Sequence, residues 1–290
     1  MRVSQSTGVE FQRRYEAVLA KWPSGVSSRV VSSRFGSTRV NVCGAADGRP
    51  TVLLSGAGAT STVWFANVAA LVDDGHRVYA IDMIGDVGAS VATNAPSTTG
   101  ELVDWLSDTL DGLGIRAASF VGHSYGAMVG LAFALASPGR VHNLVLLDPT
   151  SCFAGMAIRY LLHALPVLIR PSAERQSALL VWESGVGLDP DWIALTSYGT
   201  EHCATAKTVV PRRPSREALA ALSIPTTVVL APDSRVHDVR AVEQGVRRSL
   251  PEASVTILPS GSHHGLPIDP ADDVNAAIIA GLSVGPGLVD

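Results

Sequence analysis

The sequence predicts an α/β fold: a mostly parallel central sheet flanked by helices, with a helical segment inserted between two strands. Two observations indicate this fold. After residue 50, short apolar stretches of strand composition alternate with longer stretches of helical spacing, and such alternation is typical of a parallel sheet covered on both faces. The alternation stops between Pro149 and Ile224 and then resumes, which indicates an insertion.

The first elements precede the alternating part. Apolar residues at helical spacing predict a helix over Val9–Trp22, ended by Pro23. Two stretches rich in β-branched residues, Ser28–Ser32 and Thr38–Cys43, predict a hairpin joined at Gly36 and Ser37. In the alternating part we expect strands at Thr51–Leu54, Arg77–Ile81, Ala117–Val121, Leu144–Leu147, Thr226–Leu230 and Val255–Leu258. The helices expected between and after them are Val63–Asp73, Thr99–Leu113, Tyr125–Ala136, Val239–Leu250 and Ala271–Leu282.

Residues 150–224 are predicted to form a helical lid on a core made of residues 1–149 and 225–290. A loop of this length without secondary structure would be unusual inside a compact domain. The segment has apolar stretches of helical pattern, which argue against a solvated linker: Met156–Leu165 (before Pro166), Ala173–Glu183 and Trp192–Tyr198. Arg212-Arg213-Pro214 is expected to mark the polar return to the sheet.

Composition excludes several classes of function. Of the 290 residues, 47% are hydrophobic, and 22 basic residues are balanced by 26 acidic ones without a basic stripe, so no nucleic-acid partner is expected. No apolar run reaches the about 18 residues of a membrane span. Cys43, Cys152 and Cys203 are odd in number and widely spaced, which favours free thiols in a reducing cytoplasm over a disulfide or a metal site.

The most informative motif is Gly122-His123-Ser124-Tyr125-Gly126, which reads G-x-S-x-G. A predicted buried strand precedes it and a predicted buried helix follows it. A serine on such a sharp strand-to-helix turn is lifted clear of the sheet at the helix N-terminus, as a nucleophile requires. The competing interpretation is a glycine-rich turn whose serine only caps the helix.

A serine nucleophile needs a base, and in folds with this motif the order along the chain is serine, acid, histidine. Among the eight histidines, only His263 and His264 follow the last predicted strand. Small residues around them would let a loop bring an imidazole to Ser124. Six others lie on helices, on connections, in the insertion or before the last strand: His76, His123, His142, His163, His202 and His237.

Two aspartates could be the acid that orients the histidine. Asp148 ends a strand in Leu147-Asp148-Pro149, and Asp233 follows the next strand. Each has a structural alternative, since a strand-end carboxylate can bind backbone amides and Asp233 can form a turn. Asp82 ends another strand but precedes the serine, so a role in stabilising its turn is expected.

The charge that develops on a substrate carbonyl oxygen needs preorganised donors. The backbone N–H groups of Tyr125, at the helix N-terminus, and Ala57, in a glycine-rich loop after a strand, are the candidates. Gly56-x-Gly58 in that loop also has part of a dinucleotide-binding pattern, but Ser61 stands where the third glycine would be. Neither a cofactor nor a metal is therefore expected.

With these residues in place, the chain resembles an α/β-hydrolase, and more narrowly the bacterial carboxylesterases of the naproxen-ester-cleaving type. The resemblance covers nearly the whole chain. It rests on Trp22-Pro23, Arg34–Thr38, Ala59–Phe65, Tyr79–Asp86, the serine turn, and the spacing from His263 to Pro270. It implies an ester-cleaving serine hydrolase without a cofactor, and its spacing favours His263 over His264.

The acid departs from the family pattern. Members usually have it where this chain has Ser234, and the glycine usual two or three places earlier is missing, with Ala231 in its place. Asp233 could serve from one position earlier, or Asp148 could serve from the preceding strand, as in some lipases with a similar Leu-Asp-Pro sequence. We favour Asp148, because a strand end is more rigid than a loop and triad geometry tolerates little error.

The resulting hypothesis is a cytoplasmic serine hydrolase acting on a small to medium hydrophobic ester or thioester. Ser124, His263 and Asp148 would form the triad, and Ala57 and Tyr125 the oxyanion hole. Apolar residues of the insertion would wall the substrate: Leu161, Leu162, Leu165, Val167 and Leu168. The alternatives are a non-hydrolytic enzyme of the same fold, such as a cyclase or lyase, or a ligand-binding protein with the same pocket.

Overall fold

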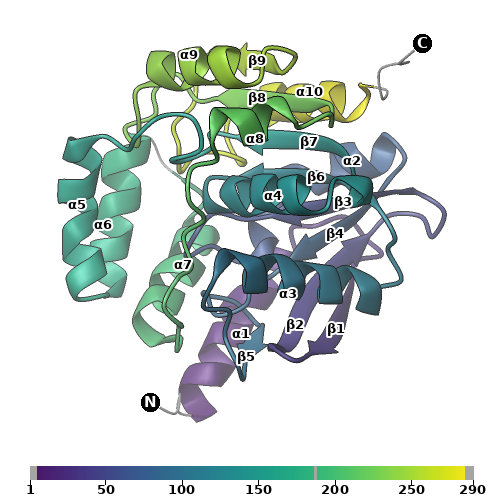
Figure 1. The fold of residues 1–290 in the computed structure, drawn as a ribbon. Helices are drawn as coiled ribbons and strands as arrows, with labels where there is room; N and C mark the ends of the chain where they lie inside the picture. The colour runs from purple at the N-terminus through teal and green to yellow at the C-terminus, as the bar shows by residue number, and fades with distance from the viewer. Residues whose placement is uncertain (1–4, 186–187, 285–290) are drawn as a thin grey trace.

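The computed structural model describes residues 5–185 and 188–284, which form one sheet with helices on both faces (Figure 1). The strand order is β1-β2-β4-β3-β6-β7-β8-β9, with β5 paired to β2. The pairs that involve β2 are antiparallel and all the others are parallel. The strands are β1 Ser27–Ser33, β2 Gly36–Cys43, β3 Arg49–Leu54, β4 His76–Ile81, β5 Val91–Ala92, β6 Ala118–His123, β7 Val141–Leu147, β8 Thr226–Leu230 and β9 Ser254–Ile257.

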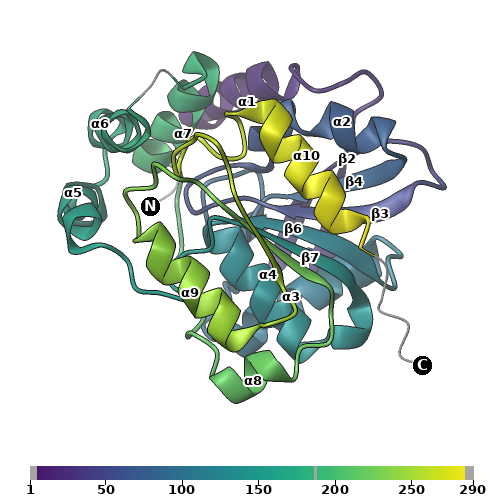
Figure 2. The same ribbon diagram turned by 90° about the horizontal axis from the view of Figure 1, so that it is seen from above.

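Helices cover both faces of this sheet. In Figure 2, α3, α4, α8 and α9 lie on one side of the strands, and α1, α2 and α10 lie on the other. The helices are α1 Gln5–Leu19, α2 Val68–Asp73, α3 Thr99–Gly112, α4 Tyr125–Ala136, α5 Ile158–Ile169, α6 Ala173–Ser184, α7 Pro190–His202, α8 Arg216–Ala220, α9 Val239–Ser249 and α10 Ala271–Leu282, with short 3₁₀ turns η1 Ser61–Ala66 and η2 Pro138–Arg140.

The apolar strands are buried because each contributes side chains to both layers. In β3, Val52 and Leu54 belong to the cluster under α3, α4 and α9, whereas Leu53 belongs to the cluster under α2 and α10. All three side chains are fully buried. Two-sided burial explains why the strands are continuous apolar runs instead of alternating ones, and the predicted α/β class is confirmed.

Local details differ from the sequence prediction. The single helix expected over Val63–Asp73 is divided into η1 and α2 at Asn67, whose buried side chain donates to the Pro267 carbonyl. The helix expected to end before Pro166 continues to Ile169. Pro166 has no N–H for the carbonyl of Leu162, but Leu162 is exposed, so water can satisfy that oxygen.

Helices α5, α6 and α7 gather at one end of the sheet, where β6 and β7 finish (Figure 1). They all come from residues 150–224, the part of the sequence that interrupts the alternating pattern. Parallel strands have their carboxyl ends at a common edge, where ligand sites of such sheets form. The arrangement therefore places the inserted helices beside Ser124 and Asp148.

Candidate active site

Ser124 lies between the end of β6 and the start of α4, in a backbone conformation that few residues adopt. Its φ is 51° and its ψ is −112°. The glycines on either side make this turn possible, because a Cβ at Gly126 would collide with the carbonyl oxygen of Leu54 and one at Gly122 would lie 2.5 Å from the carbonyl oxygen of Gly126. The structure thus supplies a physical reason for both glycines of G-x-S-x-G.

His263 connects this serine to Asp148. Its Nδ1 lies 2.6 Å from Oδ2 of Asp148, and its Nε2 lies 2.8 Å from Oγ of Ser124. An ionised carboxylate can only accept hydrogen bonds, so Nδ1–H donates to Asp148 and Nε2 is left to accept from the serine hydroxyl. Such an arrangement presents the serine with a base in the tautomer that proton removal requires.

Asp148 ends β7 and is completely buried. Burial alone would raise the pKa of its carboxyl, but hydrogen bonds from His237 and His263 outweigh that effect and hold the pKa well below its ordinary value. The backbone N–H of Ala231 and the hydroxyl of Ser234 also donate to it, at 3.1 and 2.9 Å. Asp148 is therefore ionised at neutral pH and fixed from several directions.

His237 is a site residue that the sequence analysis set aside. Its buried Nε2 lies 3.0 Å from Oδ1 of Asp148, opposite the oxygen that binds His263. Because Asp148 is ionised, the His237 Nε2–H is the donor. The sequence signal was its place after β8, close to Asp233, but position relative to the last strand argued against it.

The second candidate acid, Asp233, lies elsewhere. It is exposed, and its backbone N–H donates to the carbonyl of Gly261. Ser234, at the position where relatives usually carry the acid, directs its hydroxyl to Asp148. Of the two aspartates left open by the residues, the structure brings Asp148 to His263, and its role as the triad acid stays a prediction.

The remaining histidines near the serine have other partners. Nε2 of His264 lies 3.1 Å from the hydroxyl of Tyr160 on α5. His123 donates from Nε2 to the backbone carbonyl of His263 at 2.9 Å. Burial, followed by the nearby His263, lowers the pKa of His123 to about 3, so this side chain is neutral at physiological pH.

The candidate oxyanion donors line the same cavity as Ser124. Tyr125 is the first residue of α4, where an N–H has no intrahelical partner. Ala57 lies in the loop after β3, and Asp86 steadies this loop by accepting from the N–H of Gly58 at 3.0 Å. Both residues line the cavity beside Ser124, and their role as oxyanion donors stays a prediction.

That cavity has a volume of about 390 Å³ and extends from Ser124 and His263 to α5, α6 and α7. Its lining is mostly apolar: the inserted helices contribute Tyr160, Leu161, Ala164, Leu168, Leu180 and Trp192. Of the leucines expected in a substrate wall, Leu161 and Leu168 line it. Leu162, Leu165 and Val167 do not line it. All four leucines are partly exposed to solvent, and Val167 packs against the cluster formed by Tyr160, Ala164, Leu179 and Val236.

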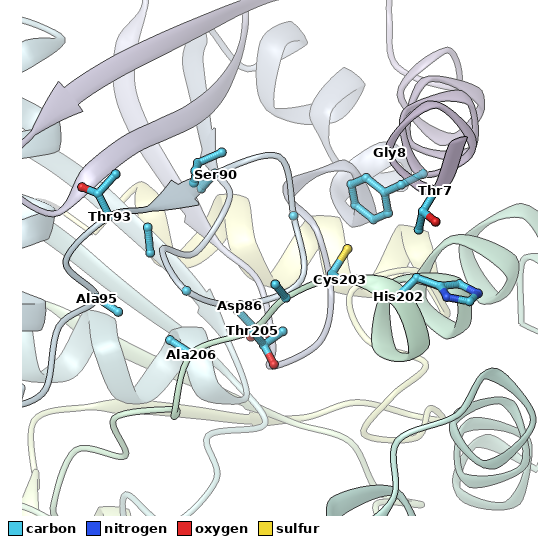
Figure 3. A pocket seen from close by; sticks show the side chains of 16 residues that line it. Thr7, Gly8, Asp86, Ser90, Thr93, Ala95, His202, Cys203, Thr205 and Ala206 are labelled. Atoms are coloured by element: carbon cyan, nitrogen blue, oxygen red, sulfur yellow. The ribbon is translucent and has the colours of Figure 1, made fainter. Parts of the chain in front are cut away.

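A second cavity, of about 590 Å³, lies between the N-terminal part of α1 and the loops around Asp86 and Cys203 (Figure 3). His202 and Cys203 both border it. Burial raises the pKa of the Cys203 thiol to about 11, so the thiol is protonated at neutral pH and is a poor nucleophile. Of these two cavities, the one that contains Ser124 is therefore the better candidate for an active site.

Comparison with known proteins identifies the family of this chain. The alpha/beta hydrolase family matches residues 51–277. The chain belongs to this family. In sequence it is 36% identical over 146 residues to the uncharacterised carboxylesterase nap, and 30% identical over 192 residues to carboxylesterase YbfK, both of Bacillus subtilis strain 168. These alignments cover 50% and 66% of this chain, but only 48% and 60% of the two relatives' lengths.

Solved structures extend the similarity over the whole fold. The crystal structure of naproxen esterase from Bacillus subtilis superposes with a TM-score of 0.89 at 25% identity, covering 97% of this chain and 99% of that one. The carboxylesterase CesB (YbfK) structure gives a TM-score of 0.90 at 24% identity, over 96% and 99% of the two chains. The resemblance to α/β-hydrolases of the bacterial carboxylesterase type is confirmed.

The described residues also bear on membranes and metals. Within residues 5–185 and 188–284, none of the helices has the length and apolarity needed to cross a bilayer. In the same part of the chain, no cluster of three or more His, Cys, Asp or Glu side chains is arranged to hold a metal ion. The expectation that the enzyme needs no cofactor stays a prediction.

Proposed function

We propose that this protein is a serine hydrolase that cleaves a carboxylic ester or thioester of a small to medium hydrophobic substrate through an acyl-enzyme at Ser124. One observation carries the proposal: the hydrogen-bonded chain from Ser124 through His263 to Asp148 opens onto a mostly apolar cavity. Similarity to carboxylesterases over much of the chain supports the same reaction class.

The mechanism follows from the donors and acceptors of this chain of residues. Ser124 attacks the substrate carbonyl carbon while Nε2 of His263 takes the hydroxyl proton. The charge that forms on the carbonyl oxygen is stabilised by the N–H groups of Ala57 and Tyr125. Asp148 stabilises the imidazolium, which then gives its proton to the leaving alcohol or thiol as the carbon–oxygen or carbon–sulfur bond breaks.

Water completes the reaction by the same route in reverse. His263 removes a proton from a water molecule, whose oxygen attacks the acyl-enzyme carbonyl. Collapse of the second tetrahedral intermediate returns the proton to Oγ of Ser124 and releases a carboxylic acid. No metal or redox step is needed for these atoms and electrons to balance.

Helices α5, α6 and α7, from residues 150–224, form the lid in this proposal, and their apolar contacts set the substrate class. A cavity of about 390 Å³ is at the lower end of the range for small-molecule sites. A naproxen ester, suggested by the name of one relative, is a suitable first substrate.

The three cysteines form no disulfide in the described part of the chain, which supports the proposed cytoplasmic location.

The test compares the natural protein with Ser124→Ala. A fluorophosphonate probe should label the natural protein only, and p-nitrophenyl esters of increasing acyl length should be hydrolysed by it alone. Labelling without turnover would instead favour the non-hydrolytic or ligand-binding alternatives. If a folded natural protein takes no label at all, the serine is not activated and the proposal is wrong.

A further inference from the structure

Glu183, near the C-terminal end of α6, is a buried carboxylate with an unusual set of partners. Its side chain is 1% exposed. It accepts three backbone hydrogen bonds: Oε1 from the N–H groups of Arg235 and His263, each at 3.1 Å, and Oε2 from the N–H of His264 at 2.8 Å. Within the described residues it forms no ion pair with a lysine or arginine side chain.

A buried carboxylate is costly unless its oxygens are hydrogen-bonded. Here the compensation comes from backbone donors of two loops, the one after β8 and the one after β9. Hydrogen bonds to an ionised acceptor are roughly twice as strong as neutral ones. Glu183 thereby fastens the backbone of His263 to a helix that lies 80 residues earlier in the sequence.

Neighbouring contacts also join the inserted helices to the loops after β8 and β9. The guanidinium of Arg235 lies 5.3 Å from the ring centroid of Trp182, the neighbour of Glu183, and donates to the Trp182 backbone carbonyl. On the other side, Tyr160 of α5 shares a hydrogen bond with His264. The histidine loop, residues 260–266, is therefore in contact with two of the inserted helices, and Glu183 makes the charged part of that contact.

The same helix also borders the candidate substrate cavity. Gln176 and Leu180 of α6 line it, and Leu180 precedes Glu183 by almost one turn, so both lie on one face of the helix. A single rigid element thus contacts the space for the substrate at one point and the backbone of the candidate base at another.

We propose that Glu183 is a positioning residue for His263, through which the inserted helices set the orientation of the base. The inference rests on the proposed function, because it assigns His263 the role of base. In this arrangement α6 is a fixed support of the active site, in contact with both the candidate substrate cavity and the backbone of His263. A misplacement of about 1 Å can reduce turnover about a hundredfold, so a support that keeps the His263 imidazole in place would maintain turnover.

The experiment uses Glu183→Gln and Glu183→Ala in the full chain. Gln keeps the size of the side chain and one accepting oxygen. It removes the charge, however, and places its own NH2 donor against a backbone N–H donor. Glu174→Gln is the matched control, because Glu174 is an exposed residue in the first turn of the same helix. The measurements are kcat and KM with a p-nitrophenyl ester, hydrogen–deuterium exchange of the loop at residues 260–266, and thermal unfolding.

We expect kcat to fall about tenfold in Glu183→Gln and about a hundredfold in Glu183→Ala, with KM changed less than about twofold. Exchange in the histidine loop should become faster in both variants, whereas Glu174→Gln should match the natural protein in every measurement. A role limited to folding would lower the unfolding temperature and leave the kcat of the folded fraction unchanged, and this result would overturn the proposal.

Two outcomes separate this inference from the proposed function. If the natural protein neither hydrolyses esters nor takes the fluorophosphonate, the proposed function fails, and loop exchange still decides whether Glu183 holds His263. Unchanged exchange at residues 260–266 in a folded Glu183→Gln sample overturns the inference, whatever the activity. Faster exchange, with lower kcat wherever activity is measurable, supports it.

Discussion

The carboxyl ends of β7 and β4 each hold a fully buried aspartate, yet the two carboxyl groups have opposite pKa shifts. Burial raises the pKa of Asp82, after β4, although the N–H groups of Ser61 and Ala89 donate to it at 2.7 Å. Burial also acts on Asp148, after β7, but hydrogen bonds from His237 and His263 lower its pKa well below the ordinary value.

The difference shows that partners, and not burial, distinguish a candidate triad acid from a structural carboxylate. Asp82 binds backbone amides and holds the loop after β3, the loop that also provides Ala57. Asp148 binds two imidazoles, one of which contacts Ser124. The carboxyl end of β4 would therefore shape the site, and that of β7 would take part in the chemistry.

The largest expected effect comes from removing the charge of Asp148. Asp148→Asn should lower kcat by a factor of about 10³ to 10⁴, because the imidazole loses both its correct tautomer and the charge that stabilises its protonated form. Steady-state kinetics with a p-nitrophenyl ester measure this change. Circular dichroism must show that the variant is folded, and a loss smaller than about tenfold would contradict the assigned role.

The same substitution at the carboxyl end of β4 should act mainly on stability. Asp82→Asn should lower the free energy of unfolding by about 1 to 3 kcal/mol, because an amide cannot accept from both backbone N–H groups with the same geometry. Urea denaturation gives this value. The contrast between the two aspartates disappears if Asp82→Asn loses kcat as steeply as Asp148→Asn at unchanged stability.

Acid should destabilise the region around the triad through His123. Its folded-state pKa of about 3 lies below the unfolded value of about 6.5, so the unfolded chain binds more protons between these two pH values. Stability is fully present above pH about 6.5 and falls by up to about 1.4 kcal/mol per pH unit below it. His263 and Asp148 are the charged or titratable groups whose fields act on His123.

His123→Gln tests this effect, because its amide N–H can still donate to the carbonyl of His263. Urea denaturation at pH 6.5 and 5.5 should show a smaller loss of stability than in the natural protein, by about 1 kcal/mol. The exposed His142 provides the control His142→Gln, which should leave the loss unchanged. Burial also lowers the pKa of His264, so part of the acid sensitivity should remain in His123→Gln. A pH dependence identical to that of the natural protein would contradict the prediction.

How far the sequence predicts this site depends on which contacts form it. Ser124 and His263 follow strands of one parallel sheet, and the common edge of such strands brings them together before any side-chain detail is known. Asp148 could be preferred only on rigidity, since the choice depends on how the loop after β8 folds. That loop turns Ser234 inward and Asp233 outward.

His237 and Glu183 could not be identified in the same way. Each acts across a long separation in sequence, 89 residues to Asp148 and 80 residues to His263, and neither belongs to a local motif. The sequence also does not predict that α5 continues beyond Pro166, because the exposure of Leu162 that permits this is a tertiary property. The roles of the site residues themselves stay predictions that only kinetics can test.

The smallest expected effect is that of a substitution at Asp233. Asp233→Asn removes a carboxylate that is exposed and whose backbone, not its side chain, bonds to Gly261. We expect kcat and KM to stay within about twofold and the free energy of unfolding within about 0.5 kcal/mol of the natural values, as for surface substitutions without special contacts. Kinetics and urea denaturation are measured beside Asp148→Asn. If Asp233→Asn alone abolishes turnover, the loop after β8 rearranges in solution and the acid acts from the neighbouring position.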